Sequence, residues 1–84
     1  MIDATSLSPE NRQRLSYLST LLRETRVNYG YTQEQVAQEI NLSRNSISKI
    51  ENNGVFRIQH LFLLAEFYEI PVNEIFADID KTNL

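Results

Sequence analysis

The sequence contains no cysteine and only one histidine. Without cysteine, the chain has neither a disulfide framework nor a thiolate metal site. The single histidine, His60, has no second histidine at ligand spacing, so a role in metal binding is not expected. We therefore predict no metal and no cofactor, and a reducing compartment such as the cytoplasm is the expected environment.

Long apolar runs are also missing. No run approaches the roughly 18 residues that a membrane-spanning helix needs. The N-terminal stretch "MIDATSLSPE" has neither a basic start nor an apolar segment, so we do not expect a signal peptide. A glycine-rich phosphate loop, a nucleophile elbow and a Cys/His dyad are all absent from the sequence. These absences predict a protein that is not an enzyme and does not contact a membrane.

The net charge of −3 argues weakly against a nucleic-acid partner, but the acidic residues are unevenly distributed. Residues 1–57 carry seven basic and six acidic side chains, which gives +1. Residues 58–84 carry one lysine and five acidic side chains, which gives −4. The N-terminal two-thirds can therefore still bind phosphates. Its small positive charge provides only weak long-range attraction to DNA.

Glycine and proline are scarce, with two of each, so each one is informative about element boundaries. Ser8 followed by Pro9 is typical of a helix start, and Gly30 is typical of a helix end. Apolar residues at helical spacing predict further helices over about 32–40, 43–54 and 58–68, and a short one after Pro71.

No stretch alternates with period two for long enough to form a strand. We therefore predict an all-α chain of five short helices, in one domain over residues 1–84. Its core is expected over about residues 12–77, with residues 1–8 and 78–84 as flexible tails.

The second and third predicted helices are joined by only "NLS", residues 41–43. Thr32 and Ser43 are typical N-cap residues, and Asn41 is a residue that tolerates positive φ. Ala37 is the small residue at which the two helices would cross. The shared apolar seam would consist of Val36, Ile40, Leu42, Ile47 and Ile50. This pattern predicts a helix-turn-helix, whose second helix enters the major groove of DNA.

The segment Leu22–Phe76 resembles the Xre-type, or lambda-repressor-like, DNA-binding domains, also called Cro/repressor-like. The resemblance is carried by Arg26, Gly30, "TQEQVA" (32–37), "LSRNSISKIEN" (42–52) and "LLAEFYEIPVNEIF" (63–76). It implies a compact five-helix domain that binds palindromic operator DNA as a homodimer. It also implies a prokaryotic repressor or activator of transcription, located in the cytoplasm and on the nucleoid when bound.

The resemblance also implies roles for individual residues. Contacts to DNA bases are expected from Arg44, Asn45, Ser48 and Lys49. Contacts to phosphates are expected from Thr32, Gln33, Ser43, Ser46, Asn52 and Arg57. Arginine can bond guanine in a bidentate way, and asparagine can do the same for adenine. Arg26 and Glu51 match an internal ion pair of the family, which is structural, and Gln33 is also expected to brace the recognition helix.

Two positions and one loop differ from the pattern of the family. Asn41 stands where the turn usually has glycine, and Thr25 stands where a large aliphatic residue is common. The loop "NNGVFR" (52–57) is shorter than its usual counterpart, and Arg57 is its only basic residue. We therefore expect looser packing around Thr25 and fewer phosphate contacts from this loop.

The stretch "IQHLFLLAEFYEIPVNEIF" (58–76) is more apolar than one face of a small domain requires. It either fills the core or forms a two-fold dimer interface, for which the candidates are Phe62, Phe67, Ile70, Ile75 and Phe76. Two alternatives to a simple regulator stay open. One is an antitoxin-type module that neutralises a small partner toxin and regulates its own synthesis, and the other is a restriction–modification controller protein.

Overall fold

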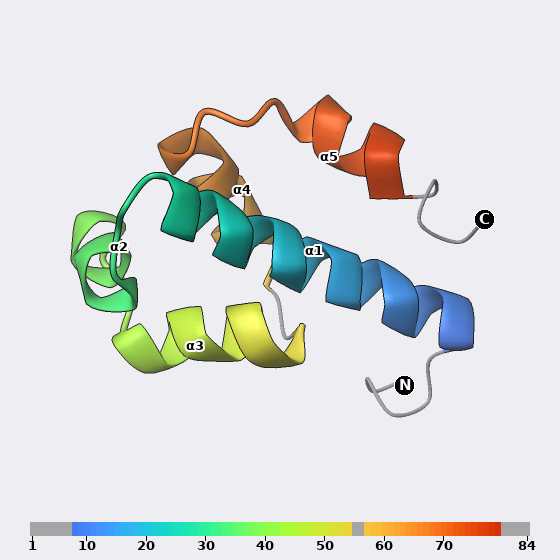
Figure 1. Cartoon of the computed structure of the whole chain (residues 1–84), viewed down its shortest axis with the longest axis horizontal. Helices are drawn as coiled ribbons and strands as arrows, with labels where there is room; N and C mark the ends of the chain where they lie inside the picture. The colour runs from blue at the N-terminus through green and yellow to red at the C-terminus, as the bar shows by residue number, and fades with distance from the viewer. Residues whose placement is uncertain (1–7, 55–56, 80–84) are drawn as a thin grey trace.

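The computed structural model describes residues 8–54 and 57–79 and is shown in Figure 1. Its helices are α1 (Pro9–Asn28), α2 (Gln33–Glu39), α3 (Arg44–Asn53), α4 (Ile58–Phe67) and α5 (Val72–Ile79). The described residues contain no strand. The predicted all-α, five-helix fold is therefore confirmed.

The ends of α1 and α5 differ slightly from the predicted core limits. At the start of α1, the Ser8 hydroxyl accepts a hydrogen bond of 3.2 Å from the backbone N–H of Asn11. At the other end of the chain, α5 continues to Ile79, which is only 8% exposed. Helix α1 thus begins at Pro9, and Ile79 packs into the interior. Of the predicted tails, residues 1–7 and 80–84 lie outside the described residues.

Local side-chain hydrogen bonds fix the starts of α2 and α3. Thr32 and Gln35 form a reciprocal capping box, with hydrogen bonds of 2.8 and 3.1 Å. The Ser43 hydroxyl accepts from the Ser46 N–H at 3.0 Å. Between the two helices Asn41 has a φ of 58°, and Leu42 N–H donates to the Ala37 carbonyl at 2.9 Å. These bonds join residues within one helical turn, so a short sequence window is enough to specify them.

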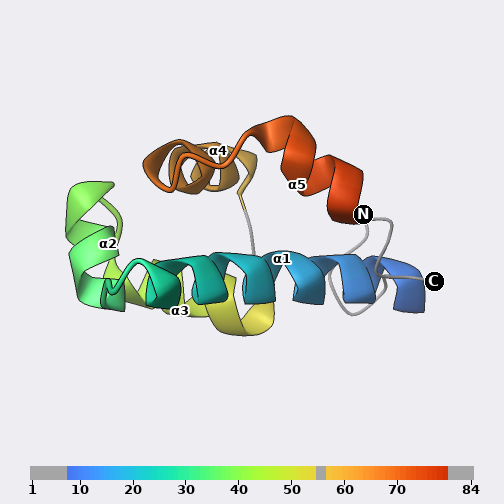
Figure 2. The same cartoon turned by 45° about the horizontal axis from the view of Figure 1, so that its top comes forward.

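Helix α1 runs through the middle of the fold and packs against α3 and α5. Figure 2 shows α4 and α5 above α1 and α3 below it, with α2 at one end. The core between these helices comprises Leu18, Leu22, Val36, Ala37, Ile47, Ile50, Leu61, Leu64, Ala65, Tyr68, Ile75 and Ile79. The predicted seam residues Ile40 and Leu42 pack against this core while staying partly exposed.

Small residues allow α3 to pack closely against α1. The hydroxyl of Ser19, which is buried, donates a hydrogen bond of 2.7 Å to the Ile50 carbonyl. Gly54 ends α3 with a φ of 66°, and a Cβ placed there would lie 3.0 Å from the Cβ of Leu15. Neither contact was predicted from the sequence, because both join residues far apart along the chain.

The C-terminal helices bury only part of their apolar side chains. Ile75 is 1% exposed and belongs to the core, so its assignment to a dimer interface was wrong. Phe67 and Ile70 are half-buried against the core, whereas Phe62 and Phe76 are 48% and 46% exposed. Thr25, where looser packing was expected, lines a hollow of about 200 Å³ between α1 and α5.

Candidate nucleic-acid interface

One face of α3 presents polar side chains to solvent. Arg44, Asn45 and Lys49 are exposed, and Ser48 is half-buried. Positions 44, 45, 48 and 49 share one side of a helix because neighbouring turns align at spacings of three and four. Within the described part of the chain, the side chains of Arg44, Asn45 and Lys49 make no hydrogen bond or ion pair. Their donors and acceptors are therefore available to a partner.

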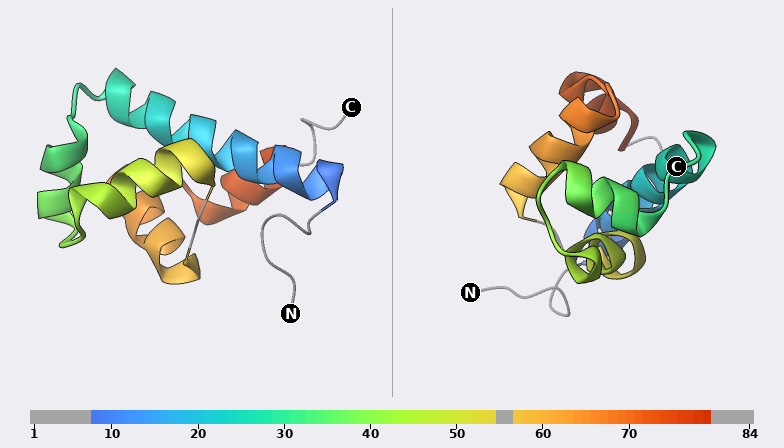
Figure 3. Two further views of the ribbon diagram at one scale, coloured as in Figure 1. Left: turned by 90° about the horizontal axis from the view of Figure 1, so that it is seen from below. Right: turned by 90° about the vertical axis from the view of Figure 1, so that its left-hand side faces the viewer.

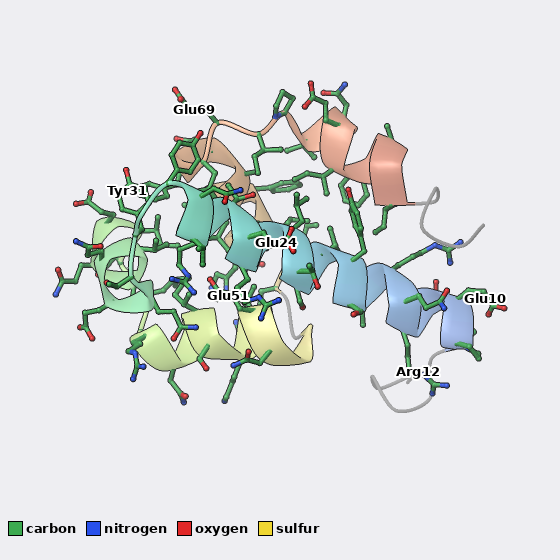
Figure 4. The ribbon with its side chains drawn as sticks, in the orientation of Figure 1. Glu10, Arg12, Glu24, Tyr31, Glu51 and Glu69 are labelled. Carbon is green, nitrogen blue, oxygen red and sulfur yellow. The ribbon has the colours of Figure 1, made fainter. Side chains whose placement is uncertain are left out.

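The back of α3 is held by a buried carboxylate. Glu51 Oε2 pairs with Arg26 Nε at 2.8 Å, and Glu51 Oε1 accepts from Gln33 Nε2 at 3.1 Å. Arg26 also donates from Nη1 to the Tyr31 carbonyl at 2.8 Å. Figure 4 shows Glu51 between α1 and α3. The structure thus contains the ion pair that the resemblance implies. With Gln33, this pair ties α1, α2 and α3 together.

The predicted phosphate-contact residues occupy different environments. Thr32 and Ser43 use their hydroxyl oxygens as helix caps, and the Ser43 and Ser46 hydroxyls lie 3.0 Å apart. Asn52 is exposed, and its amide donates to Ser48 Oγ at 3.1 Å. Gln33 is half-buried and uses its amide N–H on Glu51. In this structure Gln33 therefore braces α3, which is one of the two roles expected for it.

A hollow of about 230 Å³ lies between α3 and the first turn of α4. It is lined by Ser46, Lys49, Ile50, Arg57 and His60. No acidic side chain lines it, so its electrostatic character suits an anion such as a phosphate. Arg57 and Ser46 are predicted phosphate contacts, whereas no role is predicted for His60. The sequence does contain a signal for such a role of His60. It lies three residues after Arg57 and so faces the same side of α4.

An aromatic cluster supports the connection between α1 and α2. Tyr29 stacks on Tyr68 with ring centroids 6.0 Å apart, and its hydroxyl donates to the Tyr68 carbonyl at 3.1 Å. Tyr31 lies against Phe67 at 5.4 Å. Tyr68 itself is buried, and its hydroxyl has no hydrogen-bond partner among the described residues. Burial, and secondarily the charge of Glu51, raises the pKa of Tyr68 to about 12, while Arg26 acts in the opposite direction.

A family model described as helix-turn-helix matches residues 22–75, which is more than half of the 84 residues. The chain belongs to the helix-turn-helix family, of the Cro/C1 type. No curated protein and no solved structure matches it. The family comprises DNA-binding regulators, and α2 and α3 form the helix-turn-helix of this chain. The resemblance to the Xre-type domains is therefore confirmed.

The helix-turn-helix match begins inside α1 and ends inside α5. Residues 9–21, about two-thirds of α1, precede the matched segment. None of the described helices combines the length and apolar character needed to cross a membrane. Over residues 8–54 and 57–79, no group of three or more acidic, histidine or cysteine side chains is arranged to hold a metal ion.

Proposed function

We propose that the chain is a sequence-specific transcriptional regulator that binds palindromic operator DNA as a homodimer. The recognition helix, residues 43–53, enters the major groove of each half-site. The observation that carries this proposal is the exposed face of α3, on which Arg44, Asn45 and Lys49 have no partner within the described chain. The network around Glu51 holds this helix in place, so little ordering is needed when DNA binds.

The chemistry of this face suits the reading of bases. The guanidinium of Arg44 can donate two hydrogen bonds to O6 and N7 of guanine, and the amide of Asn45 can bond N6 and N7 of adenine. Ser48 and Lys49 lie one turn further along the helix. Each good bidentate pair contributes about 1–3 kcal/mol of discrimination against the wrong base.

Phosphate contacts would come from residues around this face. They are Thr32, Gln33, Ser43, Ser46, Asn52 and Arg57, to which we add His60 because it lines the same basic hollow as Arg57. Each neutralised phosphate releases counterions, so log K falls by about 0.9 per phosphate for each unit of log salt concentration. Binding is therefore expected to weaken steeply as salt rises.

The homodimer would be built from α4 and α5. Phe62 and Phe76 are about half exposed. Phe67 and Ile70, which lie between them in the sequence, are half-buried. An isologous contact through these residues would suit a palindromic site, which requires two recognition helices about 34 Å apart, or one turn of DNA.

The base-reading role is tested by selecting duplexes from random DNA with the wild-type protein and then comparing two variants. Arg44→Ala is expected to lose about 1–3 kcal/mol of discrimination at particular base pairs. Arg57→Ala removes the same charge at a predicted phosphate contact, so it should weaken selected and random duplexes equally. If Arg44→Ala also weakened both equally, the assignment of Arg44 to a base would be wrong.

A second candidate function is an antitoxin-type module that binds a small protein. It is favoured by the exposed apolar side chains of α4, where Ile58, Phe62 and Leu63 are 57%, 48% and 40% exposed. Recovery of a stoichiometric small partner, together with absence of a self-dimer, would support this function over a simple regulator. A restriction–modification controller would instead form the homodimer, and the genes beside its own would identify it.

A further inference from the structure

Residues 12–23 of α1 and the end of α3 enclose the largest of the hollows described here, about 440 Å³. It is lined by Arg12, Leu15, Ser16, Ser19, Thr20, Arg23, Glu51, Asn52 and Gly54. Most of these side chains come from the part of α1 that precedes the helix-turn-helix match. The proposed base and phosphate contacts use only Asn52 from this set.

The chemistry of the hollow favours an anion. Arg12, Ser16, Thr20 and Arg23 are spaced by four, four and three residues, so they lie along one face of α1. Arg12 and Arg23 are exposed, and within the described chain their guanidinium groups have no hydrogen bond or ion pair. The one acidic group of the lining, Glu51, already accepts from Arg26 and Gln33. The hollow therefore carries two uncompensated positive charges beside hydroxyl donors.

The hollow is continuous with the exposed face of α3. Asn52 belongs to both, because it lines the hollow and bonds Ser48 on α3. Figure 3 shows, in its left view, that the first half of α1 extends beyond the end of α3. In Figure 4, Arg12 points to the side of the molecule on which α3 lies, whereas Glu10 points away from it.

We propose that this face of α1 binds the sugar–phosphate backbone of the same DNA duplex whose bases α3 contacts. The proposal rests on the proposed DNA-binding function. Arg12 and Arg23 are eleven positions apart, or about 16 Å along the helix axis, which is too far for one small phosphate to bridge. A strand of DNA offers successive phosphates over that span, and an arginine fork matches the geometry of each. Residues 9–23 thus enlarge the footprint without reading sequence.

The test measures the salt dependence of binding to a duplex selected by the wild-type protein. Arg12→Gln and Arg23→Gln should each lower the slope of log K against log salt by about 0.9 per subunit, and the double variant by about 1.8. The ratio of affinities for selected and random duplexes should stay unchanged, since no base contact is lost. Ethylation of the phosphates next to Arg12 and Arg23 should block the wild-type protein but not the double variant, whereas phosphates contacted by α2, α3 and Arg57 should block both.

Two controls separate a phosphate contact from a general effect of charge or folding. Arg14→Gln removes the same charge two positions from Arg12, on another side of α1, and should leave the slope near the wild-type value. Arg12→Lys with Arg23→Lys keeps both charges and should keep the slope. Melting midpoints from circular dichroism should match the wild type for all of these variants.

Two results would overturn the inference while leaving DNA binding intact. One is a double variant with the slope and ethylation pattern of the wild type, and the other is an Arg14→Gln variant that loses as much slope as Arg12→Gln. If the wild-type protein selected no DNA at all, the proposed function would fail and this inference with it.

Discussion

At the scale of single residues, Glu51 shows how one carboxylate can hold three helices. Its side chain is 2% exposed, and its two oxygens accept from Arg26 and Gln33 at 2.8 and 3.1 Å. A carboxylate buried to this degree needs such partners, because an isolated buried charge is strongly unfavourable. The position of α3 therefore depends on side chains contributed by α1 and α2.

Arg26→Met is expected to lower the free energy of unfolding by about 3–5 kcal/mol, because it leaves the Glu51 charge buried with only one donor. Urea denaturation measures the loss. The double variant Arg26→Met with Glu51→Met should recover much of it, since paired replacement of a buried ion pair is often neutral. A double variant as unstable as Arg26→Met alone would contradict this account.

The Tyr68 hydroxyl is a second buried polar group, and it predicts instability at alkaline pH. Its pKa is raised from 10.0 to about 12, mainly by burial. Above pH 10 the unfolded chain ionises this tyrosine while the folded chain keeps it protonated, so stability falls as pH rises toward 12. The loss attributable to Tyr68 should reach about 2–3 kcal/mol over that window.

Denaturation at a series of pH values tests this prediction. Tyr68→Phe should remove the Tyr68 part of the alkaline loss, and it also removes a hydroxyl that has no partner among the described residues. Tyr29→Phe is the control, because Tyr68 and its alkaline effect remain. Identical alkaline slopes for wild type and Tyr68→Phe would refute the prediction.

At the scale of elements, the close approach of α1 and α3 depends on a residue without a side chain. Gly54 combines a φ of 66° with a position 3.0 Å from Leu15 Cβ for any added Cβ. Gly30 has a similar φ of 79°, but nothing lies within 4 Å of its added Cβ. A substitution at Gly30 therefore introduces backbone strain alone, whereas a substitution at Gly54 introduces both backbone strain and crowding against Leu15.

Gly54→Ala should lower the free energy of unfolding by about 2–4 kcal/mol, from strain plus overpacking against α1. Gly30→Ala should lower it by about 1–2 kcal/mol, from strain alone. Chemical denaturation of the two variants gives the comparison. Equal losses would mean that Leu15 moves aside without cost.

At the scale of the whole molecule, two kinds of surface lie on different parts of the fold. The exposed donors and the two basic hollows lie on α1, α3 and the first turn of α4. The exposed apolar side chains Phe62 and Phe76 lie on α4 and α5, which Figure 1 places across α1 from α3. This separation would let one protein bind DNA and a second copy of itself at the same time.

Phe76→Glu is expected to convert the homodimer to a monomer at tens of micromolar, as measured by sedimentation, because a charge would be buried at the interface. Its affinity for a palindromic duplex should fall by roughly 10²-fold or more, since the two half-sites are no longer linked. Val27→Glu is the matched control, because Val27 is also apolar and 58% exposed but lies on α1. A wild-type monomer at this concentration would remove the dimer proposal.

The sequence by itself determined the helices, their caps and the helix-turn-helix. Ser8, Thr32 and Ser43 each cap a helix as predicted, and Gly30 and Asn41 have the positive φ expected of them. These features depend on bonds and conformations within about one turn, which a short window of residues specifies. The partnership of Arg26 with Glu51 is a long-range contact, and it was predictable only through the resemblance to a family.

Only the tertiary structure decided which apolar and polar side chains meet. Ile75 and Phe76 are neighbours in sequence, yet one is 1% exposed and the other 46%. Adjacent residues of a helix point in directions about 100° apart, so their burial depends on which face a distant helix covers. The hydrogen bond from the Gln33 amide to Glu51 also depends on tertiary packing. So does the hollow that Arg12, Arg23 and Asn52 line together. Their proximity depends on how α1, α2 and α3 pack, which no local pattern specifies.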